Sequence, residues 1–356
     1  MRYVSVKALK EGMILAQSVH GSNGDLLVRN GVAMSPFLIK KLQNMGYSGL
    51  YIQDEFSDGI QITDVISDEI RNSSMKAARS IMLNAVSGEK GLIRNDLKEL
   101  MNQLKKIIDS VLSSEQSVMN VMNIKSFDLY TYQHSVNVCV LSTIIGISYG
   151  LSYEQLQNLA ITSILHDMGK SFIDKNILNK VEPLTEDESN TIKKHSTLGY
   201  IFIRDKCTFT SSVCIGTLMH HERYDGSGYP YGRKGNDIPL FAQIIAVADV
   251  YDAMISERPY RPPISPHEAY EYVIGNSGKH FNPKIVEIFS KRITPFPEGF
   301  NVLLSNGVEG IVYKNHEDLL TRPIIKIDAA QDKEAYFIDL KNDPRALEIT
   351  IKKIIV

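Results

Sequence analysis

Five histidines and two aspartates are the residues of this chain whose types and spacing could do chemistry. His166 and Asp167 stand side by side at the end of an apolar run that predicts a buried helix. Burying an imidazole and a carboxylate is costly unless something neutralises them, and a metal ion would do so. The other candidate ligands are His134, His195, His220, His221 and Asp249.

A His-Asp dipeptide alone is typical of a histidine that hydrogen-bonds its neighbour at the end of a helix. The other histidines change that interpretation. Of the nine histidines, five fall between residues 134 and 221, each on or beside an apolar segment. This clustering favours a metal site.

The donor set indicates which metals the site would hold. It contains no thiolate, so it favours iron or manganese, with zinc, nickel and cobalt as alternatives. Seven ligands exceed what one four-coordinate zinc needs. Two metals that share a bridging carboxylate would use them, and Asp167 is the natural bridge. Two metals roughly 3.5 to 4 Å apart clamp the attacking and leaving oxygens of an in-line displacement, the usual arrangement for cleaving phosphate esters.

Three cations near these ligands predict an anionic substrate. Lys170 follows the His-Asp pair by one helical turn, and Arg258 and Arg261 follow Asp249. Cations close to a metal cluster repel it unless an anion lies between them, so a phosphate-bearing substrate explains all three. Arg223, by contrast, is expected to be a solvated surface residue.

Length and composition set the broad class of protein. At 356 residues the chain can hold two or three domains. Its net charge is −2, so no global field draws it to DNA or to an anionic membrane. The three cysteines lack the paired spacing of a zinc site, and no window reaches the roughly 18 apolar residues of a membrane span. We therefore expect a cytoplasmic protein with buried, reduced thiols.

Residues 1–56 are predicted to form a small α+β unit. The predicted segments are a hairpin of residues 13–16 and 25–28, a helix from Ser35-Pro36 through Met45, and a closing strand over residues 49–52. Asn23-Gly24 is a strong hairpin signal because both residues tolerate positive φ. Nothing in this unit resembles a catalytic cluster, so we expect a packing or sensing module.

From residue 63 to residue 114 the pattern is helical. Apolar residues recur at three- and four-residue intervals between Leu97 and Leu112, a stripe one helix face wide. Two interpretations of this stripe are open. Either it packs against the chain's own catalytic domain, or it is the surface of a homodimer formed through the 97–112 helix.

Residues 118–292 carry the histidines and are predicted to be almost entirely helical, with helices over 136–149, 153–165, 186–204, 211–220, 242–255, 266–274 and 283–292. Glycines and prolines between residues 223 and 239 indicate a loop beside His220-His221. Residues 296–356 are predicted to form a small β module, with strands over 300–304, 310–313, 323–328, 335–340 and 347–356. The fold class is therefore multidomain, with a mainly α-helical catalytic domain between a small α+β module and a small β module.

Five segments of residues 118–292 resemble the HD-GYP domain, the helical branch of the HD phosphohydrolase superfamily that degrades cyclic di-GMP in bacteria. The matching segments are YTYQHS (130–135), HDMGK (166–170), KHSTLG (194–199), HHERYDGSGYP (220–230) and ADVYDAMISERPYR (248–261). Together they are highly specific, and the Gly-Tyr-Pro block after a histidine pair is diagnostic in itself. The resemblance covers about half of the chain and implies an HD-type catalytic domain, and no function is carried over to the outer modules.

The resemblance also implies a role for each matching position. The family's metal ligands fall on His134, His166, Asp167, His195, His220, His221 and Asp249. Its substrate-contacting positions fall on Lys170, Tyr229, Asp252, Arg258 and Arg261. In the implied mechanism a hydroxide between two metals attacks one phosphodiester of cyclic di-GMP, with Asp167 and Lys170 as catalytic residues. Linear pGpG leaves, and a second cleavage to GMP can follow.

Two positions depart from the family pattern. Some members carry a glutamate four residues before the first histidine and bind a third metal with it, and here that residue is Tyr130. A phenol is a poor ligand beside a carboxylate, so we predict a dinuclear centre. Asp174 stands where many members have proline, and since aspartate itself forms turns, we expect it to alter only a turn.

Two other functions remain open at this point. The sequence does not reveal the pocket walls that choose the base, so a mixed cyclic GMP-AMP dinucleotide is an alternative substrate. The other alternative is a catalytically silent scaffold that binds cyclic di-GMP. Loss of metal ligands would favour the scaffold, and none of the seven is lost.

Overall fold

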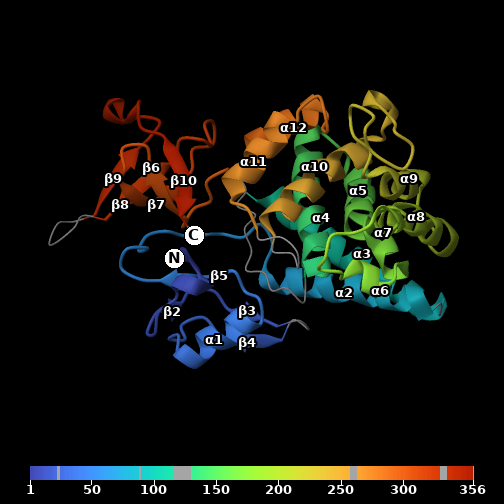
Figure 1. Cartoon of the computed structure of the whole chain (residues 1–356), viewed down its shortest axis with the longest axis horizontal. Helices are drawn as coiled ribbons and strands as arrows, with labels where there is room; N and C mark the ends of the chain where they lie inside the picture. The colour runs from blue at the N-terminus through green and yellow to red at the C-terminus, as the bar shows by residue number, and fades with distance from the viewer. Residues whose placement is uncertain (22–24, 88–89, 115–129, 257–262, 329–334, 356) are drawn as a thin grey trace.

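The computed structural model of this chain describes residues 1–21, 25–87, 90–114, 130–256, 263–328 and 335–355. A helical body lies beside two smaller parts that contain the strands, and both chain ends lie between those two parts (Figure 1). In the part of the chain that is described, no helix is both long and apolar enough to cross a membrane.

The N-terminal unit contains a three-stranded antiparallel sheet, in the order β1-β5-β2, and a two-stranded ladder of β3 and β4. Its elements are β1 (Arg2–Ser5), η1 (Val6–Ala8), β2 (Ile14–Leu15), β3 (Val19–His20), β4 (Leu26–Val28), α1 (Pro36–Asn44) and β5 (Gly49–Gln53). The predicted helix and closing strand are confirmed.

The predicted hairpin was wrong in one of its strands. Residues 14–15 pair with β5, and it is Val19–His20 that pairs with β4. Several short apolar segments precede the turn, and local patterning does not tell which of them will pair with the strand that follows. The turn residues Asn23-Gly24 lie outside the described part of the chain.

Local capping signals explain where α1 begins and ends. The Ser35 hydroxyl accepts a hydrogen bond from the backbone N–H of Leu38, and Pro36 takes the first helical position, where its missing N–H has no intrahelical partner to lose. Gly46 follows the helix with φ of 74°, the left-handed conformation in which glycine commonly ends helices.

Two long helices, α2 (Asp68–Ser87) and α3 (Lys90–Ser113), pack against each other and join the N-terminal unit to the helical body. The apolar stripe of α3 is buried: Leu100, Leu104, Ile107 and Ile108 are at most 1% exposed. They belong to the same hydrophobic cluster as residues of α4 and α5. Most of the stripe therefore packs within the chain, although Leu112 at its end is 49% exposed. A homodimer through the 97–112 helix stays a prediction.

The helical body consists of α4 (Tyr130–Tyr149), α5 (Tyr153–Leu165), η3 (Met168–Phe172), α6 (Lys175–Leu178), α7 (Glu186–Lys193), α8 (His195–Lys206), α9 (Ser211–Met219), η4 (Gly235–Asp237), α10 (Leu240–Ile255), α11 (Pro266–Gly275) and α12 (Pro283–Arg292). The predicted helices are confirmed with one difference. The helix predicted over 186–204 is two helices that meet at Lys194, so His195 begins a new helix.

Helix α4 lies at the centre of this body and contacts α2, α3, α5, α10 and α12. Val136, Val138, Cys139, Leu141, Ile144 and Ile145 are at most 2% exposed, and together they lie on all sides of the helix. A helix that is apolar all round is a buried helix. The surrounding helices are therefore held around one axis, and their ends converge beside His134.

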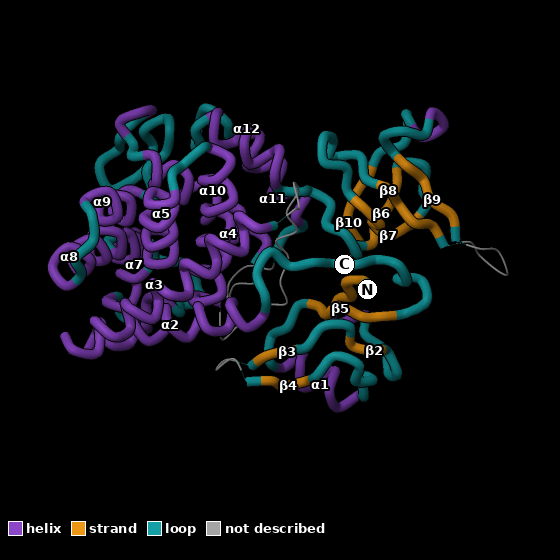
Figure 2. Tube along the Cα trace, turned by 180° about the vertical axis from the view of Figure 1, so that it is seen from behind, coloured by secondary structure: helices purple, strands orange, loops and turns teal. Residues whose placement is uncertain are grey.

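The C-terminal module is a five-stranded antiparallel sheet in the order β10-β6-β7-β8-β9 (Figure 2). Its elements are β6 (Asn301–Leu304), β7 (Glu309–Lys314), β8 (Ile324–Ile327), β9 (Tyr336–Asp339), η5 (Pro344–Ala346) and β10 (Ile351–Ile355). The predicted strands are confirmed.

The two outer modules share a hydrophobic cluster, which the sequence did not predict. The ring of Tyr3 in β1 stacks on that of Phe300, with centroids 4.7 Å apart. The Tyr3 backbone N–H also donates a hydrogen bond of 2.9 Å to the Gly299 carbonyl. Tyr51 of β5 and Ile325 of β8 belong to the same cluster. The modules at the two ends of the chain are thus packed together.

Candidate metal centre

The structure brings all seven predicted ligands together from five places in the helical body. His134 comes from α4, His166-Asp167 follow α5, His195 begins α8, His220-His221 follow α9, and Asp249 lies in α10. Their ligand atoms form two groups, each within 4.8 Å, of which one is His134, His166 and Asp167 and the other is Asp167, His195, His220 and His221. Asp167 belongs to both groups.

The two carboxylate oxygens of Asp167 face different histidines. Its Oδ2 lies 3.3 Å from His166 Nε2 and 3.8 Å from His134 Nε2. Its Oδ1 lies 3.3 Å from His195 Nε2 and 4.0 Å from His220 Nε2. One carboxylate could therefore serve two adjacent metal positions.

Asp249 also reaches both groups. Its Oδ1 lies 3.0 Å from His134 Nε2, and its Oδ2 lies 3.9 Å from His221 Nδ1. Six of the seven ligands are at most 7% exposed, and the seventh, His221, is half-buried at the mouth of the site.

Three of the histidines are oriented in the same way. The Nδ1 atoms of His166, His195 and His220 lie 2.6 to 2.8 Å from backbone carbonyls three residues earlier, those of Ser163, Ile192 and Thr217. A carbonyl can only accept, so each Nδ1 carries the proton and each Nε2 presents a lone pair to the centre. A histidine that ligates a metal is usually oriented in this manner.

His134 is oriented by a side chain instead. Its Nδ1 lies 2.8 Å from Asp252 Oδ2, and Asp252 is 0% exposed. The other carboxylate oxygen accepts a hydrogen bond of 3.0 Å from Asn137 Nδ2, and the Ser256 hydroxyl lies 3.2 Å from Oδ2. We expected Asp252 to contact substrate, and this was wrong: the carboxylate is enclosed behind His134.

Gly169 lets the His166-Asp167 segment approach α8. A Cβ at this position would collide with the His195 carbonyl oxygen and lie 2.6 Å from the Gly199 nitrogen. Real side-chain carbons do not come so close, so only glycine permits this contact. The glycine of the His-Asp-x-Gly-Lys segment therefore has a packing role: it places His195 beside Asp167.

The electrostatics leave His220 and Asp167 in the protonation states that a metal requires. Burial and the neighbouring His221 lower the pKa of His220 well below 6.5. Burial would raise the pKa of Asp167, but nearby Lys170 and His166 outweigh it and hold the pKa well below 3.8. Near neutral pH the buried imidazole is neutral and the carboxylate is ionised, as metal ligands must be.

Unpaired buried atoms test whether these residues fit a metal. His166 Nε2 and Asp167 Oδ1 are buried and make no hydrogen bond among the described residues. A buried polar atom without a partner costs free energy, and natural structures rarely leave one without a reason. Both atoms face the centre of the cluster, and all the donors are nitrogen or carboxylate oxygen, which suits intermediate divalent metals.

A cavity of about 290 Å³ opens beside the cluster, lined among others by Lys193, His220, His221, Arg223, Tyr229, Asp249, Tyr272 and His280. The Tyr229 ring stacks on His221 with centroids 4.7 Å apart, as expected of a residue that lines the site. Arg223 is exposed as predicted, but it lines this cavity. Its interpretation as an ordinary surface residue was therefore incomplete.

Of four other predicted positions, the structure describes two, Lys170 and Asp174. Lys170 Nζ lies 2.5 Å from Asp167 Oδ2, and its side chain is 26% exposed. Arg258 and Arg261 lie outside the described part of the chain. Asp174 caps α6 by accepting a hydrogen bond from the Asn176 N–H, so it does form a turn, as expected.

Sequence reasoning missed two residues that shape the site. Glu222 is 2% exposed and accepts hydrogen bonds from the backbone N–H groups of Tyr231 and Arg233, which holds the loop after the histidine pair. Asn137 holds Asp252. Glu222 stands between the histidine pair and a glycine-rich loop, and this position could have marked it in the sequence. Nothing in the sequence marks Asn137.

The comparisons with known proteins agree with this geometry. A family model described as "HD domain" matches residues 112–285. The chain is 32% identical over 269 residues to the "Cyclic di-GMP phosphodiesterase PA4108" of Pseudomonas aeruginosa, an alignment that covers 74% of this chain and 64% of that relative. It is 33% identical over 184 residues to the "3'3'-cGAMP-specific phosphodiesterase 2" of Vibrio cholerae, covering 51% of this chain and 35% of the relative.

Among solved structures, the chain is similar to Bd1817, an HDG"Y"P protein from Bdellovibrio bacteriovorus. The TM-score is 0.53 at 20% sequence identity, and the match covers 80% of this chain and 97% of that one. At this identity the likeness concerns the fold. It extends beyond the helical body, since the helical body alone is a smaller share of the chain.

The residues that the HD domain model matches include all seven candidate metal ligands. The histidine pair and the Gly-Tyr-Pro block that follows it both lie within the matched residues.

Proposed function

We propose that this protein is a metal-dependent phosphodiesterase that hydrolyses cyclic di-GMP to linear pGpG and onward to GMP. The observation that carries the proposal is that two groups of ligand atoms share Asp167 beside a cavity lined by cationic side chains. Relatives named for this activity support the substrate. The chain spans 64% of the length of that first relative, so the activity of the whole protein is a proposal.

Two divalent metals fit the donor set. His134, His166 and Asp167 would hold one, Asp167, His195, His220 and His221 would hold the other, and Asp249 would complete both. The all-nitrogen-and-oxygen donors favour iron or manganese over metals that prefer thiolates. Bound metals would supply charge neutralisation and a water of lowered pKa at the phosphodiester.

The protein's own residues would position and stabilise the substrate. Lys170 Nζ already contacts Asp167 Oδ2 and keeps further N–H donors for a phosphate oxygen on which negative charge develops. Lys193 and Arg223, which line the cavity, would hold the phosphate that is not being cleaved. Tyr229, stacked on His221, forms an apolar wall that restricts water at this side of the site.

The mixed cyclic GMP-AMP dinucleotide is the second candidate substrate, and the similarity to the Vibrio cholerae enzyme of that name favours keeping it. Both substrates present the same phosphodiester chemistry to Asp167 and Lys170. They differ in one base, so the walls of the cavity would decide between them.

The test is product formation by purified protein loaded anaerobically with Fe(II) or Mn(II), beside the double variant His166→Ala, Asp167→Ala. We expect pGpG or GMP from cyclic di-GMP with the native protein and neither with the variant. Product only from the mixed dinucleotide would transfer the proposal to that substrate. Metal and nucleotide binding without any product would favour the scaffold.

A further inference from the structure

A buried chain of hydrogen bonds connects the metal-ligand candidate His134 to α2, a helix that lies before residues 118–292, where the family resemblance begins. It starts at Arg71, whose Nη1 donates a hydrogen bond of 2.8 Å to Asn137 Oδ1. Asn137 Nδ2 donates one of 3.0 Å to Asp252 Oδ1. Asp252 Oδ2 lies 2.8 Å from His134 Nδ1.

The chemistry of each group orients the next. The guanidinium only donates, so the Asn137 amide must turn its oxygen to Arg71 and its NH₂ to Asp252. An ionised carboxylate only accepts, so His134 carries its proton on Nδ1. Nε2, which faces Asp249 and Asp167, is then the ring nitrogen through which His134 would bind a metal.

The charged ends strengthen this chain. The link from Arg71 to Asn137 is a charge-assisted hydrogen bond, and such bonds are roughly twice as strong as neutral ones. Asn137, Asp252 and His134 are at most 2% exposed, so water does not compete with these contacts. In such surroundings neighbouring hydrogen bonds polarise one another and act together.

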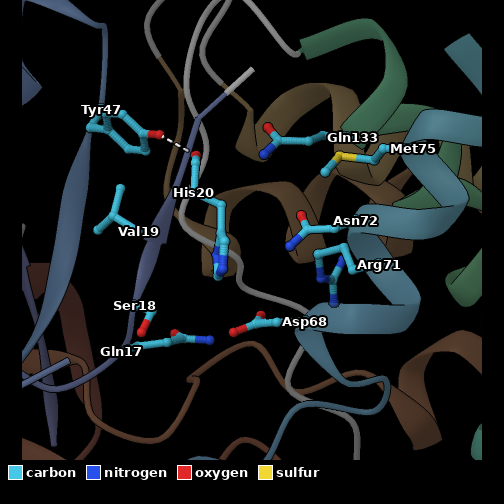
Figure 3. Close-up of a pocket in the computed structure, with 10 residues that line it drawn as sticks. All are labelled: Gln17, Ser18, Val19, His20, Tyr47, Asp68, Arg71, Asn72, Met75 and Gln133. Atoms are coloured by element: carbon cyan, nitrogen blue, oxygen red, sulfur yellow. Dashed lines mark hydrogen bonds between the residues drawn. The ribbon is translucent and has the colours of Figure 1, made fainter. Parts of the chain in front are cut away.

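Arg71 also lies where the N-terminal unit meets the helical body. It lines a small cavity with Asn72 of α2, Gln133 of α4 and residues 17–20, which come from the N-terminal unit and form the opposite wall (Figure 3). The cavity has a volume of about 40 Å³, room for no more than a few water molecules. It is therefore too small to be a second nucleotide site.

We propose that Arg71 is a positioning residue for the metal centre, acting on His134 through Asn137 and Asp252. The inference rests on the proposed function, because it takes His134 to be a metal ligand. The N-terminal unit faces Arg71 across the cavity. Arg71 therefore lies between the N-terminal unit and the hydrogen-bond chain that ends at His134. A change in that contact would alter metal affinity without any change in the ligands themselves.

The test is Mn(II) affinity, measured by calorimetry on metal-free full-length protein with the variants Arg71→Met and Arg71→Lys. Removing a partner that orients a ligating histidine typically weakens metal binding by about 10- to 100-fold. Arg71 acts through two intermediate groups, so we expect about the lower end of that range for Arg71→Met. Arg71→Lys keeps a cationic donor and should recover part of the affinity.

Lys76→Met is the matched control, because Lys76 is an exposed cation on the same helix. It should bind Mn(II) like the native protein. Equal affinity in native protein and Arg71→Met, or an equal loss in Lys76→Met, would overturn the proposal. Native protein that bound neither Mn(II) nor Fe(II) would instead contradict the proposed function, so the two failures are distinguishable.

A double-mutant cycle tests the route. If Arg71 acts through Asn137, then Arg71→Met should add little to the loss caused by Asn137→Ser, whereas independent effects would add. Thermal unfolding of each variant shows whether it is folded. Should Asn137→Ser not fold, the partly exposed position 71 still decides the proposal, through the comparison of Arg71→Met, Arg71→Lys and Lys76→Met.

Discussion

Asp167 Oδ1 lies 3.3 Å from His195 Nε2, across a helix contact that Gly169 makes possible. The same carboxylate turns its other oxygen toward His166 and His134. The centre therefore depends on one shared side chain and on one close backbone approach. Each can be tested separately.

Asp167→Asn should remove more metal than the loss of any single histidine. An amide oxygen is a weaker ligand than a carboxylate and cannot neutralise two cations. We expect bound metal to fall from about two ions per chain to one or fewer, measured by elemental analysis after anaerobic loading. Asp174→Asn is the control, since asparagine caps a helix as well as aspartate does. Two ions retained in Asp167→Asn would exclude a shared ligand.

Gly169→Ala should destabilise the protein and weaken metal binding together. The added methyl group meets the His195 carbonyl oxygen, and forcing atoms into a packed site costs about 1–3 kcal/mol. Urea unfolding of metal-free protein measures the first effect and Mn(II) titration the second. Gly275→Ala, at the end of α11 with nothing within 4 Å of the new methyl, should be neutral or slightly stabilising. Unchanged stability in Gly169→Ala would show that α8 can shift freely.

Metal-free protein should lose stability as the pH falls from 7 to 5. Burial lowers the pKa of His195 and that of His221, the latter to about 3, and burial with neighbouring imidazoles lowers that of His220. In the unfolded chain these groups take up protons near pH 6.5. Because the unfolded state binds more protons, this stability is fully present above pH 6.5 and is lost as the pH drops toward the folded values.

His134 acts in the opposite direction. Burial lowers its pKa, but hydrogen bonds to Asp249 and Asp252 outweigh burial and raise it, so its contribution is present below pH 6.5 and is lost at higher pH. The pKa is lowered for three histidines and raised for one. The free energy of unfolding should therefore fall, on balance, as the pH falls. Urea midpoints at pH 7, 6 and 5 measure it, and His220→Gln should make the dependence shallower. A urea midpoint that rose between pH 7 and pH 5 would contradict this prediction.

Tyr130→Glu should add a metal ion. Tyr130 is the first residue of α4, one helical turn before His134, and a glutamate there is what some family members use for a third metal. We expect about one further ion per chain in the variant by elemental analysis, relative to native protein loaded in the same way. Tyr130→Gln keeps a polar side chain without the charge and serves as the control. No gain in Tyr130→Glu would mean that the phenol is not what limits the centre to two metals.

Much of the fold could be predicted because it rests on local signals. The Ser35-Pro36 cap and the positive φ of Gly46 bound α1, and apolar segments of helical length located the helices of the body. The errors arose where pairing or packing between distant segments decides. Val19–His20 rather than residues 14–15 pairs with β4, and the packed ends of the chain join at Tyr3 and Phe300.

By itself, the sequence determined the chemistry available to this protein: seven nitrogen and oxygen ligands without a thiolate, in an order that matches one family, because residue type and spacing are written along the chain. Only the tertiary structure decided how those groups are used. It enclosed Asp252 behind His134, turned Arg223 into the cavity, and linked Arg71 to Asn137 across 66 residues. Such contacts depend on helix packing and on which hydrogen-bond donors meet which acceptors in a buried interior, and no local pattern encodes that meeting.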